Sequence, residues 1–227
     1  MGYAVTGSRG YAVTTARLES TQPQNRKTIM TKLHLGCGPQ ILPGWVNIDN
    51  QKYPGVDRVL DVTKKLPYEN VQYIFAEHFI EHIAYPDAVN LLRECRKALR
   101  DDGVLRLSTP NLDWVWVTHY RLDSTEQDAV SGCFYLNRAF RGWGHQFLYN
   151  ETTLKATLAE AGFSQFDRVE YGESKHEELR GLERHEKSPD YGTLSHILIL
   201  EASGRGGRPA DHVTQPRADY LRDLGVK

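Results

Sequence analysis

Short apolar runs alternate with longer, periodic or polar segments along most of this chain. Seven runs of four to seven residues are rich in Val, Ile, Leu and aromatic residues and are bounded by turn-forming residues, a pattern typical of β-strands. Two longer segments instead repeat apolar residues with the period of a helix. The predicted strands are residues 32–35, 46–49, 58–62, 71–76, 104–108, 166–171 and 195–201.

The two periodic segments, residues 86–99 and 151–161, are each followed by a glycine, Gly103 and Gly162. A glycine just after a helix often ends it, because glycine adopts the left-handed conformation readily. Strands separated by helices predict a parallel sheet with both faces covered. We therefore predict an α/β fold with a Rossmann-like, doubly wound, mostly parallel seven-stranded sheet and a helical, aromatic-rich insertion after the fifth strand.

The pattern divides the chain into three parts. Residues 1–31 lack an amphipathic period and repeat the pentapeptide GYAVT, which indicates a disordered leader or residues upstream of the true start. Residues 32–202 form the predicted domain. Within it, residues 111–150 are long for one connection and hold seven aromatic residues before His145, so they form either a lid or a small helical satellite. Residues 203–227 are expected to be a mobile tail, apart from a short helix near residues 217–224.

Composition narrows the class of protein. A chain of 227 residues that is 40% hydrophobic and 25% charged suits one globular α/β domain. A net charge of −1 provides no excess of positive charge that would attract nucleic acid or an anionic membrane, so we expect neither as a partner. Cys37, Cys95 and Cys133 form no C-x-x-C pair, which indicates free thiols in a reducing compartment. Without a signal-peptide pattern or an apolar run of about 20 residues, we expect a cytoplasmic protein.

The candidate chemistry begins where the first predicted strand ends. The sequence LHLGCGP at residues 33–39 is a strand followed by a turn with two glycines, and the second predicted strand ends in Asp49. Glycines let a backbone approach a ligand closely, and a carboxylate at the tip of the next strand can accept hydrogen bonds from ribose hydroxyls. The arrangement therefore indicates a nucleoside site, although such a glycine pair can also be a simple turn.

Taken together, these segments resemble the class I S-adenosylmethionine-dependent methyltransferases. They are most similar to a bacterial branch of type 11-like methyltransferases that are often encoded beside glycan-assembly genes. The resemblance covers about residues 32–201. Its motifs are residues 33–39, LPGWVNID at 42–49, Asp61 with LPY at 66–68, Glu81-His82, residues 99–103 and residues 158–163.

The resemblance implies a binding site for S-adenosyl-L-methionine. Gly36 and Gly38 would face its methionine part, Asp49 its ribose and Asp61 its adenine. The end of the fourth strand would line the side of the sulfonium. The implied cofactor-binding residues are Leu35, Gly36, Cys37, Gly38, Asp49, Asp61, Val62, Ala76, Glu77 and His78.

Three histidines are candidates for the catalytic base, because methyl transfer to a hydroxyl or amine requires a proton acceptor with a pKa near neutrality. His78 and His82 are four residues apart with Glu81 between them, and His145 lies in a loop rich in glycine and tryptophan. A capping or packing role is the alternative for each. The sequence HFIEH at 78–82 is also similar to the E-x-x-E-H metal site of ubiquinone-pathway O-methyltransferases, but we assign no metal ligand.

These observations predict a methyltransferase that transfers a methyl group to oxygen or nitrogen of a small molecule or sugar-bearing intermediate. A non-catalytic module that binds the cofactor as a sensor or partner subunit is the main alternative. A nicotinamide oxidoreductase fits less well, because the full G-x-G-x-x-G is missing and Asp49 follows the turn too early. The sequence does not predict the oligomeric state.

Overall fold

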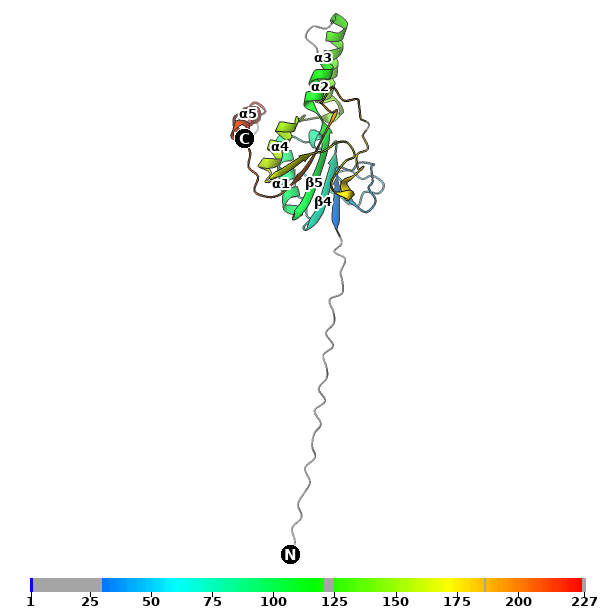
Figure 1. Cartoon of the computed structure of the whole chain (residues 1–227), viewed down its shortest axis with the longest axis vertical. Helices are drawn as coiled ribbons and strands as arrows, with labels where there is room; N and C mark the ends of the chain where they lie inside the picture. The colour runs from blue at the N-terminus through cyan, green and yellow to red at the C-terminus, as the bar shows by residue number, and fades with distance from the viewer. Residues whose placement is uncertain (2–29, 121–124, 186, 226–227) are drawn as a thin grey trace.

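A computed structural model describes residues 1, 30–120, 125–185 and 187–225 (Figure 1). The strands form one seven-stranded sheet in the order β3-β2-β1-β4-β5-β7-β6. All pairs are parallel except those made by β7, which runs antiparallel to β5 and β6. This confirms the predicted fold class. The strands are β1 (Thr31–Leu35), β2 (Val46–Asp49), β3 (Arg58–Val59), β4 (Val71–Glu77), β5 (Leu99–Pro110), β6 (Gln165–Arg168) and β7 (Ile197–Ser203).

The helices lie beside and beyond this sheet. Helix α1 packs its apolar stripe, which includes Ala88, Leu92 and Cys95, into the main core with Leu33 and Ile74 of the central strands. Removing such side chains from water is the main favourable term for the fold, because each contributes roughly 1.5–3 kcal/mol. The helices are α1 (Tyr85–Ala98), α2 (Leu112–His119), α3 (Glu126–Arg141), α4 (Glu151–Glu160) and α5 (Asp211–Asp223), with short 3₁₀ turns η1 (Ile80–His82), η2 (Gly142–Gly144) and η3 (Glu177–Leu179).

Two glycines that were predicted to end helices behave differently. Gly162 has a φ of +100° directly after α4, as predicted, and Phe163 N–H donates to the Leu158 carbonyl across it. The prediction for Gly103 was wrong. It lies inside β5, where it has no positive φ, because β5 begins at Leu99, which already pairs with Val71 of β4.

The insertion after β5 is helical. Helices α2 and α3 lie together and project beyond the end of the sheet (Figure 1). Gly132 permits this close packing, because a Cβ there would overlap the carbonyl of His119. The small core beneath the helices is Val115, Ala139 and Leu148. Of the seven aromatic residues that precede His145 in the insertion, all except Trp114 are exposed, so they do not form a packed satellite core. A lid role stays a prediction.

The predicted leader, residues 1–31, falls outside the described residues except for Met1, Met30 and Thr31. After β7, helix α5 is longer than the predicted helix at 217–224. Its Arg217 pairs with Glu160 at 2.5 Å, and its Tyr220 ring lies 5.4 Å from the ring of Phe147. Mobility of this tail stays a prediction. In the described part of the chain, no helix combines the length and apolar character needed to cross a bilayer.

A buried histidine on β1 makes the stability of this fold depend on pH. His34 is 3% exposed, stacks on Phe75 and lies 3.2 Å from the Asn47 side-chain oxygen. Burial lowers the pKa of His34 to about 4, whereas the unfolded chain has a pKa near 6.5. The unfolded state therefore binds more protons between these values, so stability is complete above pH 6.5 and falls as the pH drops towards 4.

We predict that His34→Gln removes part of this dependence. The wild-type free energy of unfolding should fall by about 3 kcal/mol more than that of the variant between pH 7 and pH 4, as measured by urea denaturation. His212→Gln on the exposed face of α5 is the control and should keep the wild-type slope. Equal slopes for wild type and His34→Gln would contradict the assignment.

Candidate active site

The turn after β1 owes its glycines to local packing and backbone conformation. Gly36 and Gly38 have φ values of +62° and +50°, in the region that favours glycine. A Cβ on Gly36 would run into the ring of Phe79, so the ring itself requires glycine there. Gly38 faces open space, with no atom within 4 Å of where a Cβ would lie. The expected open backbone is therefore present at Gly38, while at Gly36 it is covered by Phe79.

Asp49 fixes this turn from the end of β2. One carboxylate oxygen accepts the N–H of Gly38 at 2.8 Å, and the other accepts the N–H of Gln51 at 2.8 Å. Each carboxylate oxygen has a further lone-pair site, so the group can accept additional hydrogen bonds. The acid predicted to hold a ribose thus also ties the glycine turn to the neighbouring strand.

A cavity of about 670 Å³ lies between this turn and the start of α1, and we call it the glycine-turn cavity. Asp61 lies on its wall, where Thr63 donates to the carboxylate and holds the pKa of Asp61 below its usual range. The volume lies within the range of small-molecule and cofactor sites. Its walls also include Gly36, Ile48, Asp49, Val62, Phe79, His82, Ile83, Trp143 and Gln146.

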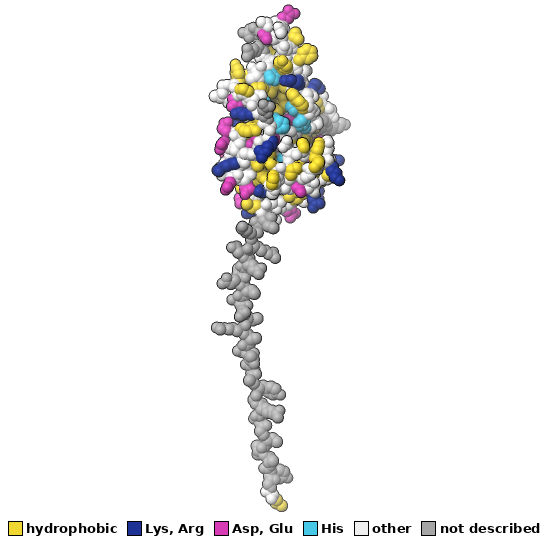
Figure 2. Space-filling model, turned by 90° about the vertical axis from the view of Figure 1, so that its right-hand side faces the viewer, with side chains coloured by type: hydrophobic (Ala, Val, Ile, Leu, Met, Phe, Trp, Pro, Cys, Tyr) yellow, Lys and Arg dark blue, Asp and Glu magenta, His cyan; other side chains and the backbone are white. Residues whose placement is uncertain are grey.

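A second cavity, of about 490 Å³, lies between the sheet and the α2–α3 helices, and we call it the histidine cavity. Figure 2 shows histidine side chains gathered on one face of the molecule, close to hydrophobic side chains. His82 and Trp143 line both cavities. The histidines of this cavity are His78, His82, His119, His145, His185 and His196, and its other walls include Trp114, Val115, Arg138 and Leu148.

Glu81 is the polar centre of the segment that follows β4. Its side chain is fully buried; one oxygen accepts the Thr109 hydroxyl at 2.9 Å, and the other lies 3.3 Å from Nδ1 of His78 and 3.9 Å from Nε2 of His82. Burial is the largest single influence and acts to raise the pKa of Glu81, but His78, a backbone contact and His82 together outweigh it, so the pKa lies below its usual value. His78 has a φ of +45°, an uncommon conformation that turns the chain out of the strand.

The loop that carries His145 is fastened to the same segment. The backbone N–H groups of Gln146 and Phe147 donate to the Glu81 carbonyl at 2.7 and 3.2 Å. Nδ1 of His145 lies 2.7 Å from the Ala139 carbonyl, so this nitrogen carries the proton and Nε2 has the lone pair. The rings of His82 and His145 are 4.9 Å apart. The structure therefore brings the three histidines that the sequence singled out, His78, His82 and His145, together around Glu81.

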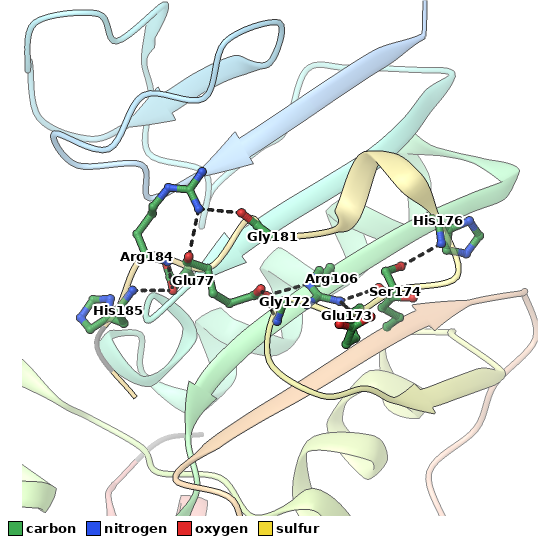
Figure 3. A network of polar contacts seen from close by, with 11 residues as sticks. Glu77, Arg106, Gly172, Glu173, Ser174, His176, Gly181, Arg184 and His185 are labelled. Carbon is green, nitrogen blue, oxygen red and sulfur yellow. Dashed lines mark hydrogen bonds and ion pairs between the residues drawn. The ribbon is translucent and has the colours of Figure 1, made fainter. Parts of the chain in front are cut away.

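The connection between β6 and β7 closes the histidine cavity from the other side. Glu77, at the end of β4, accepts the backbone N–H groups of Arg184 and His185 at 2.8 and 3.0 Å (Figure 3). The ring of His185 stacks on the ring of His78, with the centroids 3.8 Å apart and the planes 7° from parallel. Burial lowers the pKa of His185, so its ring favours the neutral form.

Arg106 on β5 anchors that connection (Figure 3). Its guanidinium is fully buried and donates to Glu183 at 2.7 Å, to Glu201 at 2.7 Å and to the Glu173 carbonyl at 2.8 Å. The polar sequence of residues 175–185 is typical of a solvated helix or loop, but Leu179 and Glu183 are buried. The signal that sequence reasoning missed was a pair of opposite charges, Arg106 and Glu201, in two otherwise apolar strands.

The structure distributes the predicted cofactor residues unevenly. Gly36, Asp49, Asp61 and Val62 line the glycine-turn cavity, whereas His78 lines the histidine cavity. The Glu77 carboxylate already accepts hydrogen bonds from backbone N–H groups of the β6–β7 connection. Leu35, Cys37, Gly38 and Ala76 line neither cavity. Sequence reasoning did not single out Phe79, Trp143 or Gln146, which belong to the walls of the glycine-turn cavity.

The sheet order, the glycine turn and the strand-end carboxylate define a class I S-adenosylmethionine-dependent methyltransferase domain. The family model described as "Methyltransferase domain" matches residues 11–165, more than half of the chain, so the chain belongs to that family. S-adenosyl-L-methionine is the cofactor of this class. No curated protein matches the chain.

Several solved structures are similar to this chain. The chain is 16% identical to the citrinin polyketide synthase CMeT domain, with a TM-score of 0.46 over 79% of this chain and 47% of that chain. It is 13% identical to the pyocyanin biosynthetic protein PhzM, with a TM-score of 0.48 over 77% of this chain and 50% of that chain. It is 12% identical to the S-adenosylmethionine-dependent methyltransferase SibL, with a TM-score of 0.46 over 81% of this chain and 51% of that chain. The chain thus spans about half the length of these proteins.

We predict that Glu183→Gln destabilises the protein by roughly 3–5 kcal/mol, because it leaves the fully buried Arg106 guanidinium with one carboxylate fewer. Glu178→Gln is the matched control on the same connection. It removes a partly exposed ion pair with Lys32 and should cost less than about 1 kcal/mol. Urea denaturation measures both values. Similar small losses for the two variants would show that Arg106 does not depend on Glu183.

Proposed function

We propose that this chain transfers a methyl group to an oxygen or nitrogen of a small-molecule or sugar-bearing acceptor bound in the histidine cavity. The observation that carries the proposal is the wall shared by the two cavities: His82 and Trp143 line both. A cofactor in the glycine-turn cavity and an acceptor in the histidine cavity would therefore be neighbours. S-adenosyl-L-methionine supplies the electrophilic methyl group, on its sulfonium.

The residues around the glycine-turn cavity fit an adenosyl group. Asp49 presents carboxylate lone pairs at its wall and would accept hydrogen bonds from the ribose hydroxyls. Asp61 and the buried Val62 would flank the adenine. The open face of Gly38 offers an approach to the turn, and the Phe79 ring at Gly36 supplies an apolar surface beside it.

The residues around the histidine cavity fit a proton transfer. We assign His78 as the catalytic base, because the negative charge of Glu81, 3.3 Å from Nδ1, favours the proton on that nitrogen electrostatically and leaves Nε2 with the lone pair. Nε2 of His78 is buried and has no hydrogen-bond partner among the described residues. His82 and His145 lie beside it on the same wall and would hold the acceptor atom in place.

The chemistry of the cavity walls suits a small acceptor. The walls combine the rings of Trp114 and Trp143 with the guanidinium of Arg138, which lies 5.3 Å from the Trp143 ring. Aromatic faces and a cation are suited to a ring-bearing or sugar-bearing molecule with an anionic group. The absence of nucleic-acid and membrane partners and the cytoplasmic location stay predictions.

We predict that Asp49→Ala weakens binding of S-adenosylhomocysteine about 10- to 100-fold, because charged hydrogen bonds of roughly 1.5–3 kcal/mol are lost. Isothermal titration calorimetry measures the affinity. Asp102→Ala is the control, since Asp102 is exposed and its carboxylate pairs with Arg100, away from the glycine-turn cavity. An Asp49→Ala affinity equal to that of the control variant would place the ribose elsewhere.

We also predict that His78→Gln lowers kcat about 10²- to 10⁴-fold while the affinity for S-adenosylhomocysteine changes less than about twofold. The assay measures release of S-adenosylhomocysteine with a panel of phenol, alcohol and amine acceptors. His212→Gln controls for general effects of histidine replacement. A His78→Gln variant with wild-type kcat would remove His78 from the mechanism.

A further inference from the structure

Three ligand-forming side chains meet where the histidine cavity approaches the segment after β4. Glu81, His82 and His145 each offer one ligand atom, and these atoms all lie within 4.8 Å of one another. The three come from two segments more than sixty residues apart, which the Gln146 and Phe147 hydrogen bonds to the Glu81 carbonyl hold together. This cluster is therefore a fixed part of the fold and does not depend on a chance approach of surface side chains.

The buried oxygen of Glu81 is the second observation that points to a ligand. Glu81 is fully buried, yet its Oε1 has no hydrogen-bond partner among the described residues. A buried anionic oxygen is costly unless a cation or a donor compensates it. Its nearest ring nitrogens are Nδ1 of His78 at 3.3 Å and Nε2 of His82 at 3.9 Å. The space beside Oε1 is thus bordered by nitrogen atoms.

The two histidines present the correct nitrogens. His145 holds its proton on Nδ1, against the Ala139 carbonyl at 2.7 Å, and so has its lone pair on Nε2. Nε2 of His82 points towards Glu81. Its Nδ1 lies beside Gly144, 3.7 Å from the position that a Cβ on this glycine would take. Metal-binding histidines characteristically have their second nitrogen bonded to a carbonyl or carboxylate, as His145 does.

We propose that Glu81, His82 and His145 bind one divalent metal ion of the zinc or cobalt type at the wall of the histidine cavity. Two imidazoles and one carboxylate favour such borderline ions over magnesium or calcium, which prefer oxygen ligands alone. Ligand atoms at about 2.1 Å from one ion lie about 3–3.5 Å from each other, so the side chains close in by about one ångström on binding.

The position of the ion defines its part in the reaction. His82 and His145 line the cavity, so coordination positions not filled by protein open towards the acceptor. The ion would hold an acceptor oxygen and stabilise its anionic form, and the proton released would pass to Nε2 of His78. Metal binding itself rests only on the three ligands, whereas this role rests on the proposed function.

The test is a titration of the metal-free full-length protein with Co²⁺, followed by visible absorption, and with Zn²⁺, followed by calorimetry. We expect one high-affinity ion per chain, and we expect His145→Gln and Glu81→Gln each to weaken it at least about tenfold. His212→Gln, on the exposed face of α5, should bind like the wild type. His145→Gln keeps the result interpretable if the buried Glu81→Gln variant does not fold.

A wild-type protein without a stoichiometric ion, or a His145→Gln variant with wild-type affinity, would overturn the metal site. Binding of S-adenosylhomocysteine is measured on the same samples, with and without the metal, and should be unchanged. If the metal binds but S-adenosylhomocysteine does not, the methyltransferase proposal fails while the metal site stands. If S-adenosylhomocysteine binds but the metal does not, the metal site is refuted and the proposed function is unaffected.

Discussion

The buried guanidinium of Arg106 is the interaction on which the architecture of the site depends. A charge inside a sheet must be fully compensated, and here the compensation comes from β7 through Glu201 and from the β6–β7 connection through Glu183. That connection has little regular structure of its own. Its position is instead fixed by Arg106 and by Glu77, which together place the His185 ring against His78. The contacts of Arg106 and Glu77 thus order the β6–β7 connection, which forms one wall of the histidine cavity.

The site itself is built where chain direction changes at the ends of β1, β2 and β4. Gly36 and His78 both adopt left-handed backbone conformations, which turn the chain out of the sheet within one residue. Asp49 then ties the glycine turn to β2, and Glu81 ties the segment after β4 to β5 through Thr109. Parallel strands bring these ends to one edge of the sheet, so two cavities lie side by side there.

The sequence predicted the sheet because its strands are short apolar runs with clear turn signals. It also singled out His78, His82 and His145 as candidates, but it did not predict that they meet, because backbone hydrogen bonds to the Glu81 carbonyl, which leave no trace in residue type, bring them together. The helix end predicted at Gly103 is wrong, because a glycine after an amphipathic segment resembles a helix end even when strand pairing begins earlier, at Leu99. The buried network of Arg106 was missed because charged residues are ordinarily exposed, and burial depends on partners from distant segments.

The wall between the two cavities can couple them thermodynamically wherever both are occupied. Because His82 and Trp143 face both spaces, a molecule that fixes these rings from one side changes the surface offered on the other. Linkage requires the effect to be reciprocal: whatever factor one ligand confers on the affinity of the second, the second confers on the first. If ligands occupy both cavities, any coupling transmitted through this shared wall would therefore be reciprocal and would need no movement of the sheet.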